Sequence, residues 1–298
     1  MKSPRRLAIA VTAMTVLSVI VAVEARPQPA TADTPAGTCG GASIPKPGGG
    51  YWTCSFDDEF SGPMLDATKW TPQVTATSGY HSGIECFVNS PNNVAVASGY
   101  LFLIARKEAA PFTCTSPFGA YTTQYTSGMV TTAGNFSQAY GRFEVRARLS
   151  PAKVAGLQTS FWLWPVDSVK YGPTWPWSGE IDIAEMYSLF PNLAIPYIHY
   201  VPPLVDLTVT NACFIGDPAE FHTYAVQWTP TSITIIYDGT TCLVDNWNPA
   251  APLHKPQPFD QPFFIALTQA LGIGLNSFLP NLTPLPAVTQ VDYVRAWT

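Results

Sequence analysis

Residues 141–149 constrain the fold most, because apolar and charged side chains alternate there without a break. The apolar members are Phe143, Val145, Ala147 and Leu149, and the charged members are Arg142, Glu144, Arg146 and Arg148. A period of two is typical of a β-strand with one buried face, whereas a helix would spread these residues around its circumference. The segment therefore predicts a strand that lies against a core.

Shorter runs of the same kind recur between turn signals at residues 101–105, 232–237 and 291–297. We find no long helical period after residue 51, and the 29 prolines of the chain are poorly tolerated inside helices. We find neither an internal repeat nor a linker after residue 50. These patterns predict an all-β, single-domain sandwich of two antiparallel sheets packed face to face.

The first 32 residues have the pattern of a signal peptide. Positive residues precede an uncharged stretch, 7–23, and small residues at 30–32 suit cleavage. A membrane-anchoring helix is the alternative, because the uncharged stretch approaches the length that spans a bilayer. With cleavage, we expect a secreted protein without a membrane partner. It would have a flexible Pro- and Gly-rich segment at 33–50 and one domain at 51–298.

Charge and cysteine content narrow the possible partners. The chain carries a formal charge of −5, and four of its 15 cations lie in the first 32 residues, which argues against nucleic acid as a partner.

Six cysteines without a C-x-x-C pair indicate three disulfides in an exported protein rather than a metal cluster. Fifteen pairings are possible. Proximity along the chain suggests Cys39–Cys54, Cys86–Cys114 and Cys213–Cys242.

Three acids fall within six residues at Glu180, Asp182 and Glu185. On a regular strand Glu180 and Asp182 share a face, but Glu185 has the opposite parity and would point into the core. A one-residue β-bulge between Asp182 and Glu185 would return all three to one face, and burying a lone carboxylate in the core would be costly. We therefore expect a bulge.

Aromatic residues surround this acidic run, namely Trp162, Trp164, Trp175, Trp177 and Tyr187. Aromatic faces stack on sugar rings, and paired carboxylates catalyse glycoside hydrolysis as nucleophile and acid/base. The alternative is an acidic edge strand exposed to solvent. Crowded carboxylates repel one another, which favours a catalytic role over a structural one.

The run from Glu180 to Glu185 resembles the E-[I/L]-D-x-x-E signature of glycoside hydrolase family 16, in the form found in laminarinases. Segments 56–62, 140–147, 221–224 and 291–295 are similar to other motifs of that family, in the same order. The resemblance covers most of the chain beyond the signal peptide. It implies a β-jelly-roll sandwich with a concave substrate cleft, and a retaining endo-β-glycosidase that cleaves β-1,3-glucan of the laminarin type.

The resemblance also implies roles for single residues. Glu180 would be the nucleophile, Glu185 the acid/base and Asp182 the acid between them, with His199 near Glu185. The expected substrate-binding residues are Asn93, Arg142, Trp162, Trp175, Trp177 and His199. A structural calcium ion, held by Glu59, the Gly99 carbonyl and Asp292, occurs in some relatives; no cofactor is expected to be required.

Residues 156–162 depart from the family motif G-x-W-P-A-x-W, so a tryptophan of the cleft wall is missing at position 158. The expected partner is a polysaccharide, bound by a monomer. Two alternatives stay open. The same site could act on another β-glycan such as a galactan, or as a transglycosylase; or the sandwich could bind glycans without cleaving them.

Overall fold

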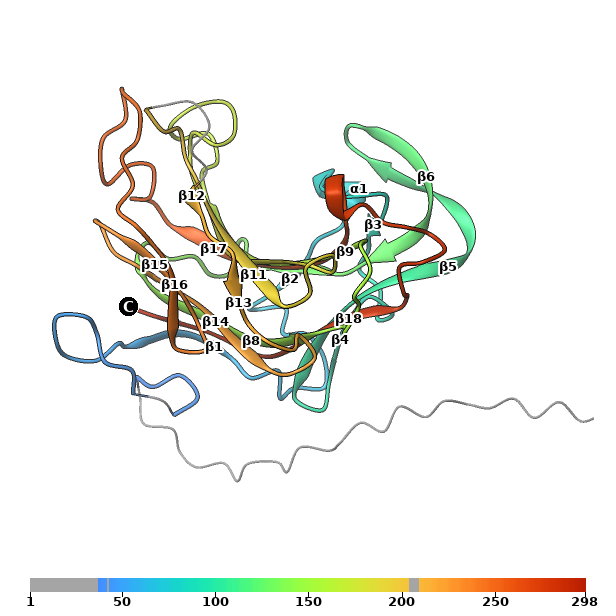
Figure 1. Ribbon diagram of the computed structural model, residues 1–298, viewed down its shortest axis with the longest axis horizontal. Coiled ribbons are helices and arrows are strands. Elements are labelled where there is room, and N and C mark those ends of the chain that lie inside the picture. The colour runs from blue at the N-terminus through green and yellow to red at the C-terminus, as the bar shows by residue number, and fades with distance from the viewer. Residues whose placement is uncertain (1–36, 42, 204–208) are drawn as a thin grey trace, which may run out of the picture.

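The computed structural model describes residues 37–41, 43–203 and 209–298, and two sheets dominate it (Figure 1). The first sheet has ten strands, eight of them in the order β16-β15-β14-β8-β18-β5-β6-β3. Their bounds are Thr240–Asp245, Ile233–Tyr237, His222–Trp228, Gly141–Leu149, Ala287–Trp297, Tyr100–Ser116, Gly119–Ser127 and Cys86–Phe87. Strand β1 (Cys54–Asp58) pairs with β18, and β4 (Val94–Ala97) pairs with β5.

The second sheet has eight strands, seven of them in the order β12-β11-β10-β9-β17-β7-β2. Their bounds are Val209–Thr210, Leu193–His199, Glu180–Tyr187, Leu157–Pro165, Phe263–Leu271, Met129–Thr131 and Thr71–Pro72. Strand β13 (Cys213–Phe214) pairs with β11. The described helices are short: α1 at Thr75–Ser78 and the 3-10 helix η1 at Gly274–Asn276.

The predicted all-β sandwich of two antiparallel sheets is confirmed, with one exception. Strands β3 and β6 pair in parallel. The four segments expected to be strands lie within β5, β8, β15 and β18, apart from Ser232, the residue before β15. Among the described residues, no helix is both long and apolar enough to cross a membrane.

The core lies between the two sheets and follows from the alternation of the strands. From β8, Phe143 and Val145 enter it, and from β9, Phe161 and Leu163 do so. Their neighbours along each strand face outward. In Figure 1 the eight-stranded sheet bends upward at its β12 end, and the hairpin of β5 and β6 rises at the opposite end. The outer face of this sheet therefore lies between two raised walls.

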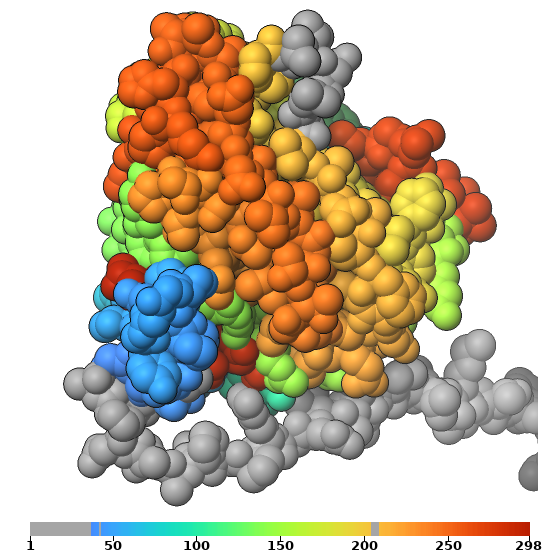
Figure 2. Space-filling view, turned by 60° about the vertical axis from the view of Figure 1, so that its left-hand side comes forward, coloured from blue at the N-terminus to red at the C-terminus, as the bar shows by residue number. Residues whose placement is uncertain are grey.

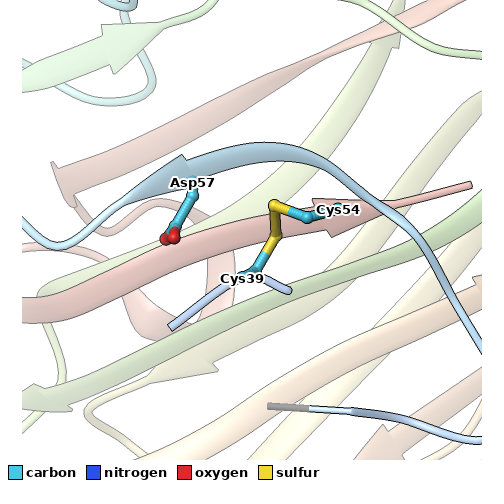
Figure 3. Close-up of side chains that lie close together, drawn as sticks. All are labelled: Cys39, Cys54 and Asp57. Atoms are coloured by element: carbon cyan, nitrogen blue, oxygen red, sulfur yellow. A yellow bond between two sulfur atoms is a disulfide. The ribbon is translucent and has the colours of Figure 1, made fainter. Parts of the chain in front are cut away.

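The N-terminal segment is tied to the first sheet. Cys39 is buried and bonded to Cys54 at the start of β1, and the backbone N–H of Gly40 donates to the Asp57 carboxylate (Figure 3). In Figure 2 the blue N-terminal residues project from this side of the molecule. In the segment 33–50, which we expected to be flexible, a disulfide and a hydrogen bond hold Cys39 and Gly40 against β1. The predicted signal peptide lies outside the described residues.

All three expected disulfides are present: Cys39–Cys54, Cys86–Cys114 and Cys213–Cys242. Cys213 lies on β13, beside the eight-stranded sheet, and Cys242 lies on the edge strand of the ten-stranded sheet. This third bridge therefore joins the two layers of the sandwich. The number of disulfides and their pairing by proximity are both confirmed.

Candidate active site

A β-bulge on β10 places the three acids on one face. Asp182 pairs with Trp162 of β9 and Ala184 pairs with Phe161, so Ile183 is an extra residue without an opposite partner. The pairing of β10 with β11 shifts by one residue at the same place. Ile183 and Ala184 are both fully buried in the core, which leaves Glu180, Asp182 and Glu185 facing away from it. The predicted bulge is confirmed.

His199 lies across from the acids on β11, in register with Glu180. Its Nε2 is 3.0 Å from Oδ2 of Asp182. One polar atom each from Glu180, Asp182 and His199 lies within 4.8 Å of the other two. The strand register therefore places the imidazole against Asp182 and beside Glu180. The charge of Glu185, near which we expected it, also acts on the imidazole.

The environment of the cluster shifts its proton affinities. Burial, and then the charge of Asp182, raises the pKa of Glu180 to about 8, against the opposing effects of His199 and of a hydrogen bond from Trp175. Burial and the charge of Glu185 also raise the pKa of Asp182 well above its usual range. Burial lowers the pKa of His199. Near neutral pH Glu180 and Asp182 therefore hold protons and the imidazole is neutral.

Glu185 is held by donors from two strands. Its Oε1 accepts hydrogen bonds from Nε2 of Gln158 at 2.9 Å and from Oγ of Ser160 at 3.1 Å, and its Oε2 accepts one from the Tyr187 hydroxyl. Gln158 and Ser160 share a face of β9 with Trp162, because they alternate with core residues. Sequence reasoning missed Gln158 and Ser160, although the parity of β9 could have identified them.

The tryptophans line the same face in different ways. Trp175 is 56% exposed, its Nε1–H donates to Oε2 of Glu180 at 2.5 Å, and its ring centroid is 4.9 Å from that of His199. Trp162 is buried and donates to the Thr268 hydroxyl at 3.0 Å. A hollow of about 110 Å³ beside Trp175 is also lined by Trp164. Trp175 is thus the most exposed of the tryptophans.

Trp177 and Tyr80 belong to loops outside the strands. Trp177 packs over Gly172, where a Cβ would lie 2.5 Å from the indole Cγ, so only glycine fits there. Tyr80 extends from the segment after α1, with its ring 6.0 Å from that of Trp162. Its ring also stacks on that of Phe87. Sequence reasoning missed Tyr80, because nothing in the local pattern links it to β9.

Two expected substrate-binding residues lie elsewhere. Asn93 is 1% exposed, and its Nδ2 donates to the Ile104 carbonyl at 2.9 Å and to the Thr126 hydroxyl at 3.0 Å. Arg142 lies on β8 of the other sheet, next in sequence to the core residue Phe143, so it faces away from the acids. Its guanidinium pairs with Glu144. One side chain is therefore buried, and the other lies on the outer face of the opposite sheet.

The side chains expected to hold calcium are engaged by arginines. Glu59 pairs with Arg295, whose Nη2 is 2.6 Å from Oε1, and Asp292 pairs with Arg146. Gly99 lies in the turn between β4 and β5. A cation there would have to displace two guanidinium groups. The residues present therefore do not fit a calcium ion.

Comparison with known proteins decides the family. The profile described as Glycosyl hydrolases family 16 matches residues 87–268, more than half of the chain. The chain belongs to this family. It is accordingly a glycoside hydrolase, and its two sheets are those of the family's jelly roll.

Several relatives of this family 16 chain are named as enzymes that act on glucans. It is 32% identical to the glucan endo-1,3-beta-glucosidase A1 of Niallia circulans, over 81% of this chain but only 37% of that protein. It is 31% identical to the beta-glucanase of Rhodothermus marinus, over 83% of this chain and 85% of that protein. The solved structure of SCLam, a non-specific endo-beta-1,3(4)-glucanase, matches with a TM-score of 0.70 at 28% identity, covering 83% of this chain and 91% of that one.

Proposed function

We propose that this family 16 chain is a secreted, retaining endo-β-glucanase that cleaves β-1,3-glucan of the laminarin type. The observation that carries the proposal is the bulge on β10, which presents Glu180, Asp182 and Glu185 together on one face. Exposed Trp175 beside Glu180 supports a sugar ring as the ligand. The substrate follows the names of the relatives, and secretion is supported by the three disulfides.

In the proposed mechanism a carboxylate oxygen of Glu180 attacks the anomeric carbon. The bond from that carbon to the departing sugar breaks, and the departing oxygen takes the proton of Glu185. Water then attacks the anomeric carbon, gives a proton back to Glu185 and releases Glu180. The two displacements retain the anomeric configuration.

This mechanism needs Glu180 ionised and a proton on Glu185 when substrate is bound. In the free site, burial and the charge of Asp182 raise the pKa of Glu180 to about 8, so a proton resides at that end of the cluster. Asp182 lies between the two glutamates on the strand. We assign to Asp182 the transfer of this proton toward Glu185 as the sugar binds, while Trp175 and His199 stabilise the anion left on Glu180.

The test is release of reducing sugar from a panel of laminarin, mixed-linkage β-glucan, agarose, carrageenan and β-galactan. We expect release from laminarin by the wild-type chain and none by Glu180→Gln, which keeps the shape of the side chain but cannot attack. Binding of laminarin by Glu180→Gln shows that the site is intact. Release from another glycan alone would replace the proposed substrate. Binding without release by the wild type would favour a non-catalytic glycan-binding protein.

A further inference from the structure

The two glutamates differ sharply in their hydrogen-bond partners. Glu180 accepts one side-chain hydrogen bond, from Trp175. Glu185 accepts three, and these divide between its oxygens: Gln158 and Ser160 donate to Oε1, whereas Tyr187 donates to Oε2. Both oxygens of Glu185 thus have hydrogen-bond donors before any substrate arrives. Within the described residues, the Tyr187 hydroxyl is the one side chain that donates to Oε2.

Tyr187 reaches Glu185 because the two residues are two positions apart on the regular part of β10, beyond the bulge. It is the last residue of β10, it pairs with Gln158 of β9, and beyond Ile183 it shares a face with Glu185. Gln158 occupies the position at which the family motif G-x-W-P-A-x-W has its first tryptophan. A flexible amide therefore replaces an indole there. The amide donor to Glu185 is therefore a property of this sequence.

The surroundings of Tyr187 favour the protonated form of its hydroxyl. Burial, followed by the charge of Glu185, raises the pKa of Tyr187 far above its usual range, and the Tyr197 hydroxyl is a further hydrogen-bonding neighbour. Tyr187 can therefore donate a hydrogen bond to Glu185 near neutral pH. It is not itself a proton source for the departing sugar.

We propose that Tyr187 is a positioning residue for Glu185, which orients Oε2 for proton transfer and stabilises the carboxylate left once the proton has gone. This inference rests on the proposed function. With Oε1 held by Gln158 and Ser160, the proton is carried on Oε2. When the Oε2–H bond breaks and the departing sugar oxygen takes the proton, the negative charge forms beside the Tyr187 hydroxyl, which strengthens that hydrogen bond.

Tyr187→Phe tests this, because it removes the hydroxyl and keeps the ring. We expect kcat/KM on laminarin to fall about tenfold or more, the size expected for losing one hydrogen bond to a charged group. On an oligoglucoside with a dinitrophenyl leaving group, which departs without a proton, kcat/KM should stay within about twofold. The alkaline limb of the laminarin profile should move to higher pH, because the ionised form of Glu185 loses a stabilising donor.

Tyr293→Phe is the matched control, since it removes a tyrosine–glutamate hydrogen bond, to Glu144 at 2.8 Å, on the opposite sheet. Tyr293→Phe should change neither the ratio of the kcat/KM values for the two substrates nor the pH profile on laminarin. Added to Glu185→Ala, the Tyr187→Phe change should cost nothing further, because its effect passes through Glu185.

Equal losses on both substrates, or a further loss in the Glu185→Ala background, would overturn the proposal. So would a Tyr187→Phe protein with wild-type behaviour on both substrates. The proposed function is judged separately: it fails if the wild type is inactive on β-glucans or if Glu180→Gln remains active, whatever Tyr187→Phe does.

Discussion

Nε2 of His199 lies 3.0 Å from Oδ2 of Asp182, and one proton satisfies both atoms. Burial lowers the pKa of the imidazole and raises that of the carboxyl, so near neutral pH the contact joins a neutral histidine to a protonated acid. His199→Phe would leave the buried Asp182 without this partner. We expect kcat on laminarin to fall about tenfold, with a smaller loss for His199→Gln, which retains a polar group. Wild-type kcat in the Phe protein would contradict this.

Replacing Glu180 should change how stability depends on pH. The pKa of Glu180 is about 8 in the folded protein and near its ordinary value of 4.5 in the unfolded chain. The folded state therefore holds a proton that the unfolded state releases, and this contribution to stability is lost as the pH rises from about 4.5 to 8. Glu180→Gln cannot ionise. Its melting temperature should rise relative to wild type across that window and the difference should stay constant above it, as thermal melts at pH 4, 6, 8 and 9 would show; a difference independent of pH would argue against the raised pKa.

Trp175→Phe should alter the acid side of the activity profile. The substitution keeps an aromatic ring beside His199 but removes the N–H that donates to Glu180 at 2.5 Å. That hydrogen bond lowers the pKa of Glu180, so its loss raises the pKa further. The acid limb of kcat/KM should therefore move to higher pH. Trp177→Phe, in the same loop, serves as the control and should leave the limb in place.

Azide separates the roles of the two glutamates. In Glu185→Ala, azide can attack the intermediate on Glu180 without base catalysis, so on an oligoglucoside with a dinitrophenyl leaving group it should restore activity and give a β-linked azide. In Glu180→Ala it should attack directly and give an α-linked azide. Nuclear magnetic resonance of the products distinguishes the two. An α-linked product from Glu185→Ala would refute the retaining assignment.

The Cys213–Cys242 bridge should contribute to global stability, because it joins β13 and β16, strands of different sheets. Replacing both cysteines with serine should lower the free energy of unfolding by about 2–5 kcal/mol. Denaturant titration would measure the loss. An unchanged unfolding midpoint would show that strand pairing alone holds the two edges together.

Much of the fold could be predicted from the sequence, because alternation of apolar and polar residues is a local signal. Alternation identified both ends of β8 correctly. It also required a bulge after Asp182, because on a regular strand Glu185 would point into the core. Disulfide pairing by proximity succeeded because each bridge spans fewer than 30 residues.

The rest of the site depends on which strands become neighbours. His199 contacts Asp182 because β11 pairs with β10 in one register, which no local pattern fixes. Arg142 lies on β8, whose bounds the sequence predicts correctly, but β8 belongs to the ten-stranded sheet, and the acids lie on the other sheet. Resemblance to the family motif assigned Arg142 to the cleft. Only the packing of the two sheets shows that its outward face and the face that carries the acids are on opposite sides of the sandwich.

The extra residue at Ile183 has a consequence for how such sites can change. Elsewhere in a sheet, inserting or deleting one residue turns every following side chain to the opposite face. Here a straight strand with acids at alternate positions and a bulged strand with one more residue would present the same three carboxylates. A single-codon insertion or deletion at this point is therefore compatible with unchanged chemistry, so sequences of either length can share one arrangement of acids.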